Sequence, residues 1–188
     1  MIMYQLLRPL AYMSIRDDSK WKIDILLPML FSILATCTIY ALPVAPVIFG
    51  KDGVIQLLMG LFQILPGFYL TALAAVATFN RPDMDNLLPD PAPTVEVSVR
   101  GRSTKIELTR RRMLSMLFGY LTFLSFGIYF VSLAAQIGAP SVVAMTPAWL
   151  LWYVRCAFSV GFGFLLWQMI FITLFGLYQL SDRMHQPD

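Results

Sequence analysis

Residue types that carry out catalysis are few and widely spaced in this 188-residue sequence. The only histidine is His185, near the end of the chain, and both cysteines, Cys37 and Cys156, lie in apolar surroundings typical of packing residues. A metal site or a catalytic triad needs several such groups close together. Neither a phosphate-binding glycine loop nor a pair of carboxylates inside an apolar stretch takes their place. We therefore expect no enzyme activity, no metal site and no cofactor.

Three polar residues instead interrupt or border long apolar stretches. Gln63 and Gln168 carry amides that need partners in an apolar environment, so we expect them to form hydrogen bonds between helices. Asp24 is predicted to be a solvated carboxylate near Lys20 or Lys22, and a proton-relay role is the alternative. These groups predict helix association rather than chemistry.

Arg155 is the one basic residue within an apolar stretch. Its guanidinium either extends to the outer membrane interface beside Trp152 and Tyr153, or faces an outer cavity, where it pairs with Asp52 or lines a vestibule. An unpaired charge in mid-bilayer costs at least about 2.5 kcal/mol. Both alternatives therefore keep Arg155 near the outer surface.

The polar residues are set in four apolar stretches, residues 23–44, 54–79, 113–135 and 149–178. Each can cross a hydrocarbon layer of about 30 Å at about 1.5 Å per residue. The composition agrees, because 58% of the residues are hydrophobic and 13% are charged, against about 25% charged in soluble domains. The predicted fold class is an all-α membrane protein with four transmembrane helices, arranged as two helical hairpins.

The basic residues predict the orientation of these spans. With both termini in the cytoplasm, twelve of the 14 Lys and Arg residues lie inside, and only Lys51 and Arg155 lie outside. Such a bias defines orientation in bacterial inner-membrane proteins. The cluster Arg110, Arg111 and Arg112 fits the same role and a contact with lipid phosphates. The loop lacks stacking aromatics, so no direct nucleic-acid binding is expected.

The loop between spans two and three carries a strand signal. Hydrophobic and polar residues alternate on both sides of a turn around Gly101, which predicts a β-hairpin. A lone hairpin is marginally stable, so its apolar face is expected to rest on helix ends, another copy or a cytosolic partner. The residues expected to bind a partner are Val95, Val97, Val99, Arg100, Arg102, Ile106 and Leu108.

Small residues in the fourth span favour close helix packing. Ala157 and Gly161, like Ser159 and Gly163, are spaced four apart, as in small-xxx-small helix contacts. Packing within one chain and self-association both satisfy this pattern. The predicted oligomer interface combines these four residues with Gln63 and Gln168.

The predicted domain organisation has five parts. Residues 1–22 form a cytosolic amphipathic segment, with Ile2, Leu6, Leu10 and Met13 at helical spacing; an irregular lead-in disturbed by Pro9 is the alternative. Residues 23–79 form transmembrane hairpin 1, 80–112 the cytosolic loop, 113–178 transmembrane hairpin 2 and 179–188 a cytosolic tail.

The layout resembles the membrane subunit of the bacterial Kiwa antiphage defence system. The features that carry the resemblance are four spans, cytosolic termini and the loop PAPTVEVSVRGRSTKIELTRRR before span three. The resemblance covers the whole chain in architecture and includes no catalytic fingerprint. It implies a homo-oligomeric inner-membrane sensor of infection, with a tetramer as the suggested form, that controls a cytosolic DNA-binding effector.

The sequence therefore predicts a non-enzymatic sensor and scaffold in the bacterial inner membrane, in contact with lipids and a cytosolic effector. A small homo-oligomeric channel or transporter is the alternative.

The predicted orientation can be tested with reporter fusions. Fusions at Ser103 and Gln186 should report the cytoplasm, and a fusion at Gly50 should report the periplasm, because the basic residues segregate so unevenly. A periplasmic signal at Ser103 would overturn the orientation.

Overall fold

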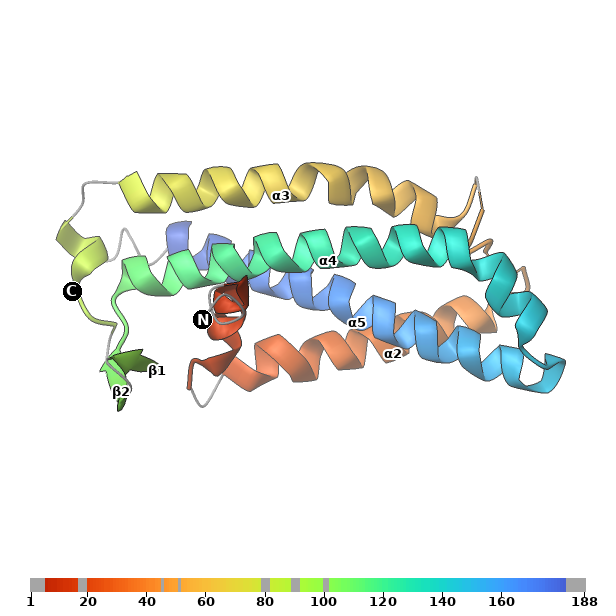
Figure 1. Cartoon of the computed structure of the whole chain (residues 1–188), viewed down its shortest axis with the longest axis horizontal. Helices are drawn as coiled ribbons and strands as arrows, with labels where there is room; N and C mark the ends of the chain where they lie inside the picture. The colour runs from red at the N-terminus through yellow and green to blue at the C-terminus, as the bar shows by residue number, and fades with distance from the viewer. Residues whose placement is uncertain are drawn as a thin grey trace.

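Four long apolar helices form the body of the molecule (Figure 1). The computed structural model describes residues 6–16, 20–44, 46–50, 52–78, 82–88, 92–99 and 102–181, without the side chains of 82, 83, 97–99, 102 and 103. The helices are α2 (Leu27–Ala41), α3 (Val54–Thr78), α4 (Arg110–Met145) and α5 (Ala148–Ser181). With the turn that precedes α2, each is long and apolar enough to cross a membrane. The chain therefore has the helical content of a multi-pass membrane protein.

The first span begins with a π-helix, η2 (Lys22–Leu26), that leads directly into α2. Pro28 explains this wider turn, because a proline inside a regular α-helix donates no hydrogen bond and its ring clashes with the carbonyl four residues earlier. In the π-turn the Leu27 N–H donates to the Lys22 carbonyl instead. The Asp24 carbonyl, four residues before Pro28, accepts from the Gln168 side chain on α5, at 2.8 Å.

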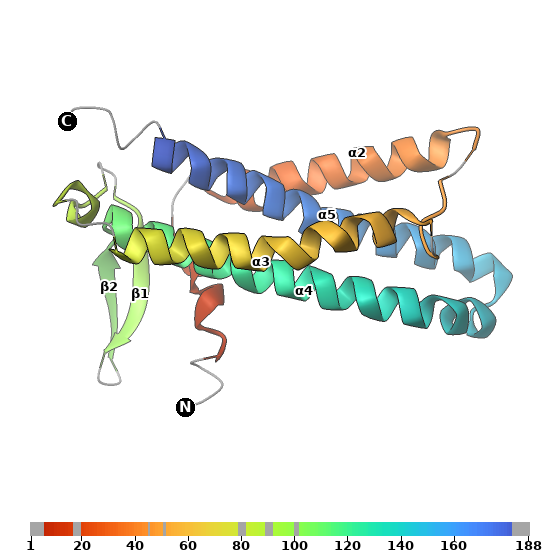
Figure 2. The same ribbon diagram turned by 90° about the horizontal axis from the view of Figure 1, so that it is seen from above.

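The helices run up and down in chain order, but their closest packing does not follow that order (Figures 1 and 2). α3 packs along α4, α2 packs along α5, and α4 and α5 contact each other. The two predicted hairpins thus describe the connections, whereas the most extensive contacts join helices of different hairpins. At the α2–α5 contact, α5 presents small residues that α2 approaches closely.

The end of the third span was predicted wrongly. Residues 136–147 were expected to form a loop, yet α4 continues through Pro140 to Met145, and only Thr146 and Pro147 separate it from α5. Residues 136–145 contain no charge, and an internal proline in a membrane helix removes only one hydrogen bond, which its neighbours can offset. α4 is therefore about 54 Å long at 1.5 Å per residue.

The predicted β-hairpin is present. Strands β1 (Thr94–Val99) and β2 (Arg102–Glu107) pair antiparallel, with Val95 opposite Ile106 and Val97 opposite Thr104. In Figure 2 the hairpin runs across the helix axes at one end of the bundle. We call this the hairpin end; the 3-10 helices η1 (Arg8–Ser14) and η3 (Pro82–Asp85) also lie there. The opposite end, with residues 46–50, is the loop end.

The closest approach between α2 and α5 is at Gly163. A Cβ at this glycine would lie 2.7 Å from the Ser32 Oγ. The Ser32 hydroxyl donates to the Val160 carbonyl on α5 at 2.6 Å. Gly161, two residues earlier, is exposed, and a Cβ there would meet nothing within 4 Å. Gly163 is therefore a packing residue inside the chain, and Gly161 is not.

Replacing the two glycines separately should distinguish them. Gly163→Leu should lower the thermal midpoint in detergent, because the side chain forces α2 away from α5 and disrupts the Ser32 hydrogen bond. The expected loss is about 1–3 kcal/mol. Gly161→Leu is the matched control and should leave the midpoint of the monomer unchanged. Equal midpoints for the two variants would contradict the assigned α2–α5 contact.

Candidate functional site: a polar junction at the hairpin end

The first strand of the hairpin is tied to the N-terminal segment. The Arg16 N–H donates to the Thr94 carbonyl at 3.0 Å, and the Thr94 N–H donates back at 3.4 Å. The Arg16 guanidinium also forms an exposed ion pair with Glu96, at 3.2 Å. Exposed pairs contribute little stability, so the backbone bridge is the stronger link. It is an isolated antiparallel bridge at the first residue of β1.

The base of the second strand is held from the other side. The Leu88 N–H donates to the Leu108 carbonyl at 3.2 Å, the Leu108 N–H donates to the Pro93 carbonyl at 3.1 Å, and the Arg110 N–H donates to the Asn86 carbonyl at 3.2 Å. Val95 and Leu108 are buried in the same core as the helix ends. The hairpin therefore rests on its own bundle, one of the three supports predicted for it.

The N-terminal segment is a 3-10 helix rather than the predicted amphipathic α-helix. Pro9 lies in its first turn, and the buried residues are Tyr12 and Ile15, while Leu6 and Met13 of the predicted apolar face are exposed. Three residues per turn bring every third residue onto one edge. The helix type therefore differs from the prediction, whereas the predicted position of this apolar face on the inner leaflet stays a prediction.

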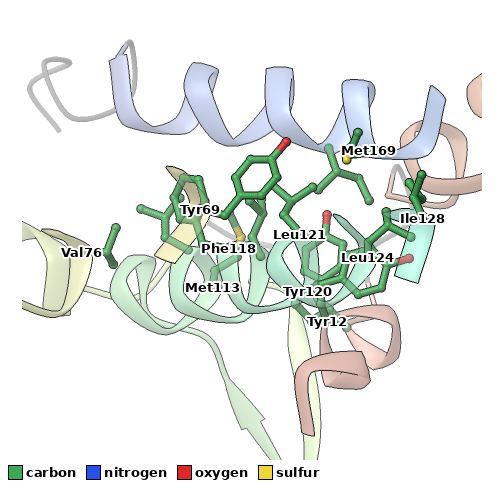
Figure 3. Packing of buried hydrophobic residues seen from close by; sticks show 14 of the residues in the cluster. Tyr12, Tyr69, Val76, Met113, Phe118, Tyr120, Leu121, Leu124, Ile128 and Met169 are labelled. Atoms are coloured by element: carbon green, nitrogen blue, oxygen red, sulfur yellow. The ribbon is translucent and has the colours of Figure 1, made fainter. Parts of the chain in front are cut away.

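Tyr12 inserts between the helices at the hairpin end. Its ring stacks on Tyr120 of α4, with centroids 5.3 Å apart (Figure 3), and its hydroxyl donates to Asp24 Oδ1 at 3.2 Å. Only 1% of Tyr12 is exposed. One side chain thus joins η1 to α4 and to the start of the first span.

Asp24 is buried, contrary to the prediction of a solvated carboxylate. The predicted partner is correct, because the Lys20 ammonium donates to Asp24 Oδ2 in an ion pair. The Lys20 Nζ also lies 3.9 Å from the Tyr12 ring centroid, within cation–π distance. Removing one partner of a buried pair leaves an uncompensated charge, which costs about 3–5 kcal/mol. The pair therefore needs the N-terminal segment in place.

Gln168 completes the junction from α5. Its Oε1 accepts from the Tyr120 hydroxyl at 2.9 Å, and its Nε2 donates to the Asp24 carbonyl at 2.8 Å. This amide was expected to bond between helices, and it does so within one chain. It links α4, α5 and the first span at one point, and it satisfies the carbonyl that Pro28 leaves without its usual donor.

A small cavity of about 60 Å³ lies beside this junction. Its lining combines the Lys20–Asp24 pair with side chains from the N-terminal segment, the first span, the residue before β1, α4 and α5: Tyr12, Ile15, Ile23, Pro93, Met113 and Phe175. Such a volume holds a few water molecules. It suits hydration of the ion pair better than an organic substrate.

Arg111 forms a second set of polar contacts at the hairpin end. The sequence did not distinguish it from Arg110 and Arg112. Its guanidinium binds both carboxylate oxygens of Asp85, at 2.8 and 3.1 Å, and donates to the Val76 carbonyl near the end of α3, at 2.9 Å. The hydrogen bond from Arg111 holds the pKa of Asp85 below its usual value. Arg111 therefore fixes the end of α3 to η3.

The hairpin residues predicted to bind a partner divide into three groups. Val95 and Leu108 are buried against the bundle. Ile106 is half-buried. Arg100 and the side chains of Val97, Val99 and Arg102 lie outside the described part of the chain.

The predicted oligomer interface is largely used inside the chain. Ser159 Oγ lies 3.3 Å from the Tyr40 hydroxyl of α2, Gly163 faces Ser32, and Gln168 belongs to the junction. Exposed Gln63 donates to the Tyr129 hydroxyl at 3.4 Å. Ser159, Gly163 and Gln168 thus have partners within one chain, and their role between copies stays a prediction. Only Ala157 and Gly161 remain exposed without a described contact.

Arg155 is exposed on α5, near the loop end. Among the described residues it forms no ion pair with Asp52 or with any other carboxylate. Trp152 and Tyr153 beside it are also exposed, at 58% and 60%, as the interfacial alternative requires. Cys37 and Cys156 are free thiols.

The described residues contain no group of three or more His, Cys, Asp or Glu side chains placed to hold a metal ion. Comparison with protein-family models, with curated proteins and with solved structures gave no match to the chain. The junction therefore has to be interpreted from its own contacts. Sequence reasoning missed Tyr12, Tyr120 and Arg111. For Tyr120 the signal was the predicted need of Gln168 for a hydrogen-bond partner.

Replacing Gln168 and Gln63 by leucine, one at a time, should distinguish a buried glutamine of the junction from an exposed one. Gln168→Leu removes two buried hydrogen bonds, one from the Tyr120 hydroxyl and one to the Asp24 carbonyl, so stability should fall by about 1–3 kcal/mol for each. Gln63→Leu removes one long hydrogen bond at an exposed position and should be nearly neutral. Thermal denaturation in detergent measures both variants; equal stability would contradict the role of Gln168.

Proposed function

We propose that this chain is a multi-pass protein of the bacterial inner membrane with both termini in the cytoplasm. The support is fourfold: four span-length apolar helices, a strong inside bias of basic residues, Trp21 exposed at the start of the first span, and Trp152 exposed near the start of the fourth. Large apolar side chains also cover the outer faces of α2, α3 and α4, where lipid chains would contact them. The hairpin end is then cytoplasmic.

The hydrogen bonds between helices support a particular position of the bundle relative to the hydrocarbon layer. Gln168 lies level with Asp24, and Gln136 of α4 lies level with Gly50, whose N–H donates to it at 3.0 Å. The part of the first span from Asp24 to Ala41 is about 27 Å long at 1.5 Å per residue, close to the hydrocarbon thickness. The part of α5 beyond Gln168 then extends about 20 Å towards the cytoplasm. Most of the buried core lies at this inner level.

The function that this arrangement favours is a non-enzymatic sensor and scaffold. The observation that carries it is the polar junction, where Tyr12, Asp24 and Gln168 couple the N-terminal segment to α4, α5 and the first span. The same segment is bridged to β1. A rearrangement of the spans would therefore move the hairpin, which is exposed to the cytoplasm.

The resemblance to the Kiwa membrane subunit extends this proposal. In that reading the stimulus is phage infection at the membrane, the output is control of a cytosolic DNA-binding effector, and the chain acts as a homo-oligomer. Ala157 and Gly161 are the remaining candidates on α5 for contact between copies.

A channel or transporter is the second candidate. The buried hydroxyls of Ser32, Ser125 and Ser132 all donate to helix carbonyls, which argues against a polar path through one copy. A pore would form between copies, with Arg155 at its outer mouth. Ion flux from liposomes that contain the purified protein would favour this candidate over the scaffold.

Aspartate substitutions on the hairpin should test the scaffold. In cells that also express the protein encoded beside this one, Val97→Asp with Ile106→Asp should abolish co-purification of that neighbour, because two charges disrupt the hairpin surface. Membrane insertion should persist, since neither residue lies in a span.

The matched control is Val47→Asp, the same change at an exposed position of the loop end. It should leave co-purification intact. If the hairpin variant still retains the neighbour, the hairpin is a connector and the scaffold proposal fails.

A further inference from the structure

The three residues per turn of η1 divide it into three edges. Pro9, Tyr12 and Ile15 form the edge that packs into the bundle, and Arg8, Ala11 and Ser14 form a second edge. The third edge is apolar and outward: Leu7 is 47% exposed and Met13 39% exposed, with Leu10 half-buried between them. Leu6, next to this edge, is 65% exposed. An exposed apolar edge of this kind would not stabilise a short helix in water.

The level of η1 is set by its hydrogen bond to Asp24. Tyr12 binds the carboxylate at the start of the first span, where Trp21 and Lys22 are both exposed. Trp and Lys side chains mark the headgroup layer of a bilayer. Figure 2 shows the N-terminal segment extending sideways from α4, across the helix axes. η1 thus lies in the plane of the headgroup layer rather than above it.

The charges near this edge favour an anionic surface. Residues 1–22 contain four basic residues, Arg8, Arg16, Lys20 and Lys22, and two acidic ones. Lys20 is paired with Asp24, and the side chains of Arg8 and Lys22 are exposed. A short apolar edge flanked by basic side chains is the pattern of an interfacial helix on anionic lipid.

The area argues against a second copy of this chain as the occupant. Seven residues at about 2 Å per residue give a helix about 14 Å long, whose exposed edge offers on the order of 150 Å². A stable protein interface needs about 800 Å² from each partner. A lipid surface has no such requirement, because each headgroup and acyl chain binds separately.

We infer that η1 is an anionic-lipid contact of the inner leaflet, in which Leu7, Leu10 and Met13 enter the acyl boundary and Arg8 and Lys22 bind phosphates. This inference rests on the membrane placement in the proposed function. Lipid binding holds η1 against α4, and Tyr12 transmits that constraint to the junction. Anionic lipid therefore stabilises the anchored state of the hairpin.

Hydrogen exchange of the full-length protein in nanodiscs tests the inference. Amides in residues 6–16 are compared in phosphatidylcholine alone and in nanodiscs with about one-third phosphatidylglycerol. Exchange should be about tenfold slower with the anionic lipid, the effect expected from one or two basic side chains at such a surface. The double variant Leu7→Gln with Met13→Gln should lose this difference; both residues are exposed, so the fold should persist.

Two controls separate lipid contact from structure. Val47→Gln at the loop end should retain the full lipid response. Tyr12→Phe should speed exchange in both nanodiscs by the same factor. It removes the hydroxyl that donates to Asp24 and leaves Leu7, Leu10 and Met13 unchanged.

Other results would overturn the inference. These are equal exchange in both nanodiscs, protection that rises with protein concentration (a second copy), and protection produced by inorganic phosphate without anionic lipid. Failure of the proposed placement is recognised separately: the chain would not co-elute with nanodiscs, and the fusion at Ser103 would not report the cytoplasm.

Discussion

The Asp24 carbonyl and its hydrogen bond to Gln168 organise the hairpin end of this protein. Pro28 removes the amide that would bond the Asp24 carbonyl in a regular helix, and in an apolar environment such a group must find another donor. Gln168 supplies it from α5, and its own carbonyl oxygen is satisfied by Tyr120 of α4. Because three helices share this exchange, their relative heights are fixed at one level.

The same position also gathers the N-terminal segment. The Asp24 side chain is buried with its carbonyl, so it needs both Lys20 and Tyr12. Burying a charge is tolerable only when it is paired and hydrogen-bonded. The segment that supplies these groups then adds a backbone bridge to the hairpin, which a two-stranded sheet needs for stability. The hairpin is therefore linked to the junction through the N-terminal segment.

The contacts inside the chain change how self-association should be judged. Gln168, Ser159 and Gly163 look like interface residues in a sequence, since polar and small residues both promote helix association. In this fold α2 lies against Ser159 and Gly163, and the junction contains Gln168. A pattern that favours close helices does not say whether the second helix belongs to the same chain. Among the small residues of α5 that the sequence singled out, Ala157 and Gly161 are exposed and remain available for contact with another copy.

Much of the architecture is determined by the sequence itself. Long apolar stretches have few alternatives to membrane-length helices, and alternation around Gly101 has few alternatives to a hairpin, because these patterns depend on local periodicity. The polar residues that need partners, Gln63, Gln168 and the carbonyl released by Pro28, are also evident there. Local patterns fail for the part of α4 beyond Ala135 and for the 3-10 helix Arg8–Ser14. Each contains a proline, and a proline can either end a helix or be accommodated within it.

Which partner each polar group finds was decided only in the tertiary structure. Tyr12, Asp24, Tyr120 and Gln168 are far apart in sequence and meet because α2 packs on α5 rather than on α3, and that choice depends on shape complementarity between whole helix faces.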